Sequence, residues 1–138
     1  MSREWLYRAA GSLIVLVFLV GLEPAIGQGP PTENKGLTVG STATIDLGPE
    51  IGVQGRTLRL RLLTLAPGGV LALHSHRDRP AVAYIIQGTL TEHREGGWVK
   101  EHYAGESWPV GTDVTHWEEN TGSEPLVAVA ADVPKSGM

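Results

Sequence analysis

The chain has 138 residues, with 11 lysines and arginines against 15 aspartates and glutamates, so it is mildly acidic and long enough for one domain. It contains no cysteine, which excludes disulfides, thiolate metal sites and a cysteine nucleophile. No basic stripe marks a surface for nucleic acid, and we expect no nucleic-acid partner. Its 18 glycines and 9 prolines favour an all-β domain with many turns.

Residues 1–27 have the pattern of a signal peptide. Arg3 and Arg8 precede an uninterrupted apolar run at residues 9–22, which is shorter than the roughly 20 residues of a straight transmembrane helix. Ala25 and Gly27 stand where a signal peptidase reads small side chains, so the sequence predicts cleavage after Gly27. The alternative is an uncleaved membrane anchor with residues 28–35 as its tether. Both interpretations place the domain outside the cytoplasm, periplasmic or secreted, and cleavage would leave it without membrane contact.

The rest of the chain alternates strand-like runs with turns. Residues 28–40 are polar and rich in glycine and proline, which predicts a flexible lead-in before a β domain at residues 41–134. Strands are predicted at residues 42–47, 56–65, 70–76, 81–87, 89–95, 98–104, 114–120 and 126–131. A turn is expected at residues 67–69, where Pro67 is followed by two glycines. About eight strands without a sustained helical period imply a barrel or a two-sheet sandwich.

The strand at residues 56–65 has a marked period of two. Leu58, Leu60 and Leu62 alternate with Arg59 and Arg61. This pattern predicts one face in a core and the other in water. The leucines also give this short chain apolar surface to cover.

Three histidines have the arrangement of metal ligands. His74 and His76 are two residues apart in a predicted strand, so both side chains project from the same face. His116 lies in another predicted strand and can close a site from across a barrel. The sequence therefore predicts one divalent transition metal ion on these histidines, and imidazole alone does not choose among Fe, Mn, Zn, Ni and Cu. The alternative is that they are ordinary surface or core histidines.

The surroundings of these histidines resemble the two conserved motifs of the cupin superfamily. The first motif is matched by Gly68, His74, His76 and Gly88, and the second by Gly105, Pro109, Gly111, His116 and Asn120, with two spacings altered by about two residues. The resemblance covers residues 58–133. It implies a single cupin barrel, a double-stranded β-helix or jelly roll, of the small type-2 or quercetin-dioxygenase-like kind.

One position departs from the cupin pattern, because Ala81 stands where the first motif has its glutamate. The chain could then hold a dead site, a three-histidine site or a carboxylate recruited from elsewhere. Three-histidine shells occur in cupin-like oxygenases that cleave β-diketones or oxidise thiols. Such a neutral shell leaves the full charge of the ion uncompensated, which favours an anionic chelating molecule. Glu92 is the candidate replacement ligand, and a register slip that leaves it on the surface is the alternative.

Other side chains suggest structural roles. His93 and His102 are expected at the surface, and Trp98, Trp108 and Trp117 in packing or subunit contacts. The charged loop Arg77, Asp78 and Arg79 follows His76 directly. It is either a solvated turn or, at the mouth of a barrel, a group that attracts an anionic ligand.

These features favour an extracytoplasmic metal-binding cupin, a three-histidine oxygenase-like enzyme acting on a small anionic or chelating molecule. No residue is assigned as catalytic. The alternatives are a non-catalytic module that binds or senses a small molecule or a metal, and a structural barrel that has lost its metal. Single-domain cupins resemble one another in forming dimers, so we expect a homodimer that pairs sheet faces or exchanges the strand at residues 42–47.

Overall fold

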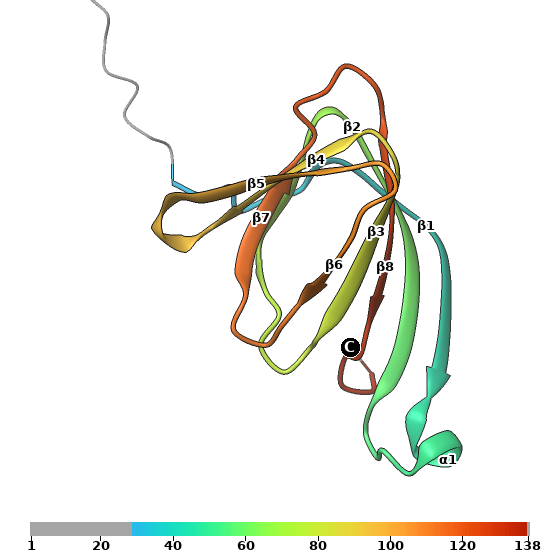
Figure 1. Cartoon of the computed structure of the whole chain (residues 1–138). Helices are drawn as coiled ribbons and strands as arrows, with labels where there is room; N and C mark the ends of the chain where they lie inside the picture. Colours follow the sequence, from blue (N-terminus) through green and yellow to red (C-terminus); the bar gives the residue numbers. More distant parts are fainter. Residues whose placement is uncertain (1–28, 138) are drawn as a thin grey trace, which may run out of the picture.

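A computed structural model describes residues 29–137, and its strands curl around a common interior into a nearly closed barrel (Figure 1). The elements are β1 (Lys35–Asp46), α1 (Leu47–Ile51), β2 (Thr57–Ser75), β3 (Ala81–Gln87), β4 (Thr89–Arg94), a 3₁₀ turn (Glu95–Gly97), β5 (Trp98–Tyr103), β6 (Ser107–Val110), β7 (Thr115–Glu119) and β8 (Leu126–Asp132). The predicted all-β barrel is therefore confirmed. The predicted signal peptide lies outside the described residues. Within residues 29–137, no helix is both long and apolar enough to cross a membrane.

All eight strands belong to one hydrogen-bonded sheet. Its order is β5-β4-β7-β2-β8-β3-β6, and β1 pairs antiparallel along β2. Strand β2 is the link between the two sides of the barrel. Its first half pairs with β8 from Arg59 to Leu65, and its second half pairs with β7 from Val70 to Ser75. One long strand thus joins the part of the barrel made of β8, β3 and β6 to the part made of β7, β4 and β5.

The predicted turn at residues 67–69 is wrong, because β2 runs through it. The pairing of β2 with β1 shifts register here, from Leu37 opposite Leu65 to Lys35 opposite Val70. Gly68 has a φ of 67°, a left-handed conformation that few other residues adopt. The extra residues form a bulge at which β2 changes partner from β8 to β7.

The structure shows which face of β2 lies inside, a point that the alternating pattern left open. Leu58 and Leu60 are 42% and 46% exposed, while Arg59 and Arg61 turn inward and bond the buried carboxylate of Asp132 on β8. The period of two is present, but the apolar side chains lie outside and the charged ones inside. Ionic pairing explains how the barrel tolerates the arginines.

Several boundaries differ from the predicted ones. Strand β1 begins at Lys35, inside the predicted lead-in, because it finds its partners along β2. Strand β6 was not predicted, since it has four residues and contains Pro109. Helix α1 was also missed. Its first turn is capped by the Asp46 carboxylate, which accepts a hydrogen bond from the Gly48 backbone N–H.

The apolar core borders the histidines, because four of its members line the same cavity: Leu90, Trp108, Val110 and Ala128. Its buried members are Leu65, Ile85, Leu90, Trp108, Val110, Val114, Leu126 and Ala128. They come from six different strands or their connections, so the core ties both sides of the barrel together. The side chains that line the candidate site are therefore held on strands that the core fixes in place.

Candidate metal centre

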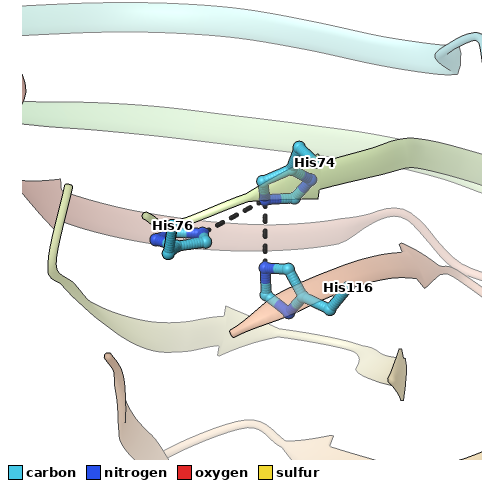
Figure 2. A group of neighbouring side chains, drawn as sticks. All are labelled: His74, His76 and His116. Atoms are coloured by element: carbon cyan, nitrogen blue, oxygen red, sulfur yellow. Dashed lines mark hydrogen bonds between the residues drawn. The ribbon is translucent and has the colours of Figure 1, made fainter. Parts of the chain in front are cut away.

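The structure brings His74, His76 and His116 together (Figure 2). His74 on β2 is the direct cross-strand partner of His116 on β7, so both side chains lie on the same face of the sheet. His76 follows the last residue of β2 and points to the same side. The Nε2 atom of His74 lies 3.2 Å from Nε2 of His76 and 3.0 Å from Nε2 of His116. Ligand nitrogens of all three lie within 4.8 Å of one another.

The opposite nitrogen of each ring contacts an oxygen atom. His74 Nδ1 is 2.8 Å from the Ala72 carbonyl, and His76 Nδ1 is 3.1 Å from the Arg79 carbonyl. His116 Nδ1 is 2.7 Å from Oε1 of Glu92. Because carbonyls and carboxylates only accept, each Nδ1 carries the proton and donates it. All three Nε2 atoms are then unprotonated in the neutral rings.

Three unprotonated nitrogens at such short range fit a metal ion. The contacts drawn between the rings in Figure 2 bring acceptor to acceptor, so neutral rings with these tautomers cannot satisfy them by hydrogen bonding. An ion bound about 2.1 Å from each nitrogen separates neighbouring ligands by about 3.0 to 3.4 Å. The two Nε2 separations from His74 fall within or at the edge of that range.

The environment keeps two of these rings neutral. Burial lowers the pKa of His74 to about 4, and burial with the nearby Arg79 charge lowers the pKa of His76 to about 4. A neutral imidazole is the form that binds a metal ion. At neutral pH, both rings therefore present free lone pairs.

A small cavity of about 50 Å³ opens beside the three rings. Its wall is formed by Arg61, Leu63, Leu71, His74, His76, Ala81, Ala83, Leu90, Trp108, Val110, His116, Glu118, Ala128 and Ala130. Arg61 and Glu118 are the charged members of a wall that is otherwise apolar or imidazole. Burial raises the pKa of Glu118 to about 7.

The comparison with protein families agrees with this architecture. A sequence model of the cupin domain matches residues 61–132, just over half of the chain. The chain belongs to the cupin family. The match begins at Arg61 on β2 and ends at Asp132 on β8, so it includes all three clustered histidines.

Individual relatives give the same fold. A germin-like protein of Arabidopsis thaliana (subfamily 3 member 3) is 31% identical over 84 residues, which are 58% of this chain and 40% of the relative. This cupin thus spans less than half the length of that protein. A double-stranded β-helix protein from Klebsiella pneumoniae aligns with a TM-score of 0.54 and 23% identity, covering 59% of this chain and 70% of the other. An oxalate oxidase in complex with glycolate aligns with a TM-score of 0.54 and 18% identity, covering 74% and 56%.

Ala81 lies in the wall of the cavity, at the position where the cupin motif has a glutamate. The metal-ligand cluster within residues 29–137 comprises the three histidines and no carboxylate. Among the three alternatives left by the sequence, the geometry favours a three-histidine site. The fit of the nitrogens to an ion argues against a dead site.

Glu92 takes neither of the roles that the sequence suggested. It is fully buried, so the register slip that would leave it on the surface is wrong. It also stays outside the ligand cluster, because its carboxylate accepts hydrogen bonds from His116 Nδ1, Arg94 Nε and His102 Nε2. Burial alone would raise the pKa of Glu92, but these bonds outweigh burial and lower it to about 2. Glu92 is a fixed anion that orients His116.

Of the other two histidines, only His102 departs from the prediction. His102 is 2% exposed, so its predicted surface role is wrong. Its ring stacks on Trp108 with centroids 3.8 Å apart, and its Nε2 lies 2.9 Å from Glu92. His93 faces away from the cluster and stacks on Trp117 at 3.7 Å, with its Nε2 2.8 Å from Glu119. The sequence lacked a signal for His102, because its burial depends on how β5 folds over β4.

The charged loop after His76 is held by ion pairs. Asp78 contacts Arg56 and Lys135, and Arg79 donates to Asp132 at 2.8 Å. Arg79 also lines an outer groove of about 310 Å³ together with Arg61 and His74. Of this loop, only Arg79 therefore shares a groove with the histidine cluster, whereas Arg77 and Asp78 line a separate outer groove.

Proposed function

We propose that this cupin binds one divalent transition metal ion on His74, His76 and His116 and acts as an oxygenase-like enzyme on a small anionic molecule that chelates the metal. The observation that carries the proposal is the convergence of three Nε2 atoms, with the Nδ1 atom of each ring held by a hydrogen bond to an oxygen. When bound, the ion would supply Lewis acidity and open positions for substrate and oxygen. Fe, Mn, Zn, Ni and Cu all suit an imidazole shell.

The protein's own residues have separate tasks in this proposal. Glu92 holds the His116 ring in one orientation and one tautomer. The apolar wall of the cavity limits water around the ion, which strengthens electrostatic interactions there. The neutral ligand set leaves the charge of the ion to be balanced by the substrate, so an anion binds better than a neutral analogue of the same shape.

Metal titration tests the binding half of the proposal. We expect the purified protein to bind one equivalent of a divalent ion, and His76→Ala to lose this binding because two neutral imidazoles remain. His93→Ala is the matched control, since His93 lies outside the cluster and should leave the titration unchanged. Tight binding by His76→Ala would show that the proposed metal site does not exist.

Oxygen uptake tests the enzyme half. The iron- or manganese-loaded protein is presented with a panel of small carboxylic acids, and consumption of O₂ that His76→Ala abolishes supports an oxygenase-like activity. Metal and acid binding without any turnover across the panel contradicts the enzyme and supports the non-catalytic binding module.

We also propose that the protein works outside the cytoplasm, in the periplasm or secreted. The support is the sequence of residues 1–27, in which Arg3 and Arg8 precede an apolar run and small residues end it at Gly27. Mass spectrometry of the protein from its native compartment should find a mature chain that begins at Gln28. A chain that retains residues 1–27 contradicts cleavage and supports the membrane anchor.

A further inference from the structure

Two buried donors on the wall of the histidine cavity lack a partner. Within residues 29–137, Arg61 Nε and Trp108 Nε1 are the buried side-chain nitrogens without a hydrogen bond. Arg61 lies on β2 and Trp108 on β6, yet both side chains line the same cavity as His116. Buried donors are almost always paired in folded proteins, because an unpaired one loses its bond to water and gains nothing. Their presence around one cavity indicates that its contents carry hydrogen-bond acceptors.

The charge around Arg61 favours an acceptor that is also an anion. Asp132 is shared by three guanidinium groups, those of Arg59, Arg61 and Arg79. One carboxylate balances one of these three charges. Arg59 bonds Asp132 through two nitrogens, at 3.0 and 2.8 Å, whereas Arg61 reaches it through Nη2 alone at 3.2 Å. Of the two arginines on β2, Arg61 therefore donates fewer hydrogen bonds to Asp132, and it is Arg61 that lines the cavity.

The size of the cavity sets the size of the ligand. A volume of about 50 Å³ holds about four water molecules, which suits an acid group with one or two further carbons. Arg61 and His74 also line the outer groove of about 310 Å³. A ligand can therefore reach the cavity through this groove, past Arg61 and Arg79, or leave a longer tail in it.

We propose that the cavity is a subsite for a small carboxylic acid, whose carboxylate accepts hydrogen bonds from Arg61 and Trp108 beside the three histidines. The proposal deepens the proposed function and rests on it for the metal, since Arg61 would select the acid that the ion then chelates. Glu118 is the acidic side chain of the same wall. Replacing it with the neutral, equally sized glutamine should leave acid binding intact or tighten it.

The test measures binding of acetate, with neutral acetamide as its shape control, to the zinc-loaded protein by NMR titration. Arg61→Gln should weaken acetate binding roughly tenfold or more, and Trp108→Phe severalfold, as expected for hydrogen bonds to a charged group. Arg59→Gln is the matched control, because Arg59 also bonds Asp132 from β2 but does not line the cavity. It should change acetate binding less than twofold. Zinc affinity should be the same in all these variants.

The outcomes test the carboxylic-acid subsite separately from the proposed metal-dependent function. Equal weakening by Arg59→Gln and Arg61→Gln, or equal binding of acetate and acetamide, overturns the subsite. If Arg61→Gln does not fold, Arg61→Lys compared with Arg59→Lys makes the same test, since lysine keeps the charge and removes Nε. If the protein fails to bind zinc, the proposed function fails. Acetate binding to the metal-free protein that still depends on Arg61 then supports the subsite alone.

Discussion

Glu92 is a buried carboxylate that orients one histidine of the proposed metal centre and lies outside the ligand cluster itself. It accepts three hydrogen bonds, and the one from His116 Nδ1 fixes which nitrogen of that ring is free for an ion. It also places a fixed negative charge one imidazole away from the proposed ion, which would make the His116 ring a stronger ligand. His102 and Arg94 hold the carboxylate in place, so the orientation of His116 depends on residues from β4 and β5.

At the residue scale we predict that Glu92→Gln weakens metal binding about tenfold to a hundredfold, the usual effect of losing a partner that orients a ligand. The stoichiometry should stay at one ion, because the three histidines remain. Competition titration with a chelator measures the affinity, and circular dichroism checks the fold. Glu101→Gln is the matched control, since Glu101 is an exposed glutamate on the adjacent β5. A folded Glu92→Gln variant with unchanged affinity would refute the orienting role.

The clustered histidines could be predicted from sequence, while the groups around them could not. Two histidines at a spacing of two share a face of any strand, so His74 and His76 needed only local geometry. Glu92 is different. Two of its three partners, His102 and His116, come within reach only after β4 pairs with both β5 and β7. A pattern along one strand carries no information on such contacts across strands.

At the scale of elements, β2 is where the predicted and observed structures differ most. Alternation fixes that two faces differ, but not which one is inside. The side of β2 that faces inward in its first half is decided by Asp132 on β8, which gives the arginines a buried partner. The predicted turn failed for a related reason, because a bulge at Gly68 lets β2 continue into its pairing with β7.

The Asp132 cluster should be a main source of stability. Asp132→Asn leaves three arginines without their shared carboxylate, and we expect it to lower the free energy of unfolding by about 3 kcal/mol at neutral pH. Asp78→Asn is the matched control. Asp78 also contacts two basic side chains, but it is half exposed and screened by water, so its loss should cost much less than the loss of Asp132. Urea unfolding at pH 7 measures both variants, and equal losses would contradict the cluster's special role.

The same cluster predicts a pH dependence. Burial raises the pKa of Asp132, but hydrogen bonds from Arg59 and Arg79 and the charge of Arg61 outweigh it, so the folded pKa lies below the usual value. A lowered folded pKa contributes stability that is complete above the unfolded pKa of about 3.9 and is lost as pH falls through the folded pKa. The gap in unfolding free energy between the parent and Asp132→Asn should therefore shrink from pH 7 to pH 3. A gap that stays constant would show that the lowered pKa makes no contribution.

At the scale of the whole molecule, the outward leucines of β2 belong to a larger apolar face. Cross-strand pairing places Leu60 beside Ala131 of β8, and Ala131 beside Val82 of β3. Leu58 and Tyr84 extend the face along its two flanking strands, and Val82 is 56% exposed. A contiguous exposed apolar surface on a soluble domain usually marks an interface. Because the face is uncharged at its centre, a second copy of the same face can cover it by symmetry.

We therefore predict that the protein is a homodimer that pairs these sheet faces, and that sedimentation at micromolar concentration gives twice the mass of one chain. A charge at the centre of the face should separate the copies, since each dimer would bury it twice without a partner. Leu60→Glu with Val82→Glu should sediment as a folded monomer.

Val99→Glu is the control, because Val99 is equally exposed but lies on β5, outside the face. If the parent is a monomer, or if Val99→Glu disrupts the dimer instead, the interface lies elsewhere or is absent. The double variant Leu60→Glu with Val82→Glu also distinguishes this dimer from one that exchanges β1 between copies. A dimer held together by β1 paired along β2 should remain a dimer in that variant.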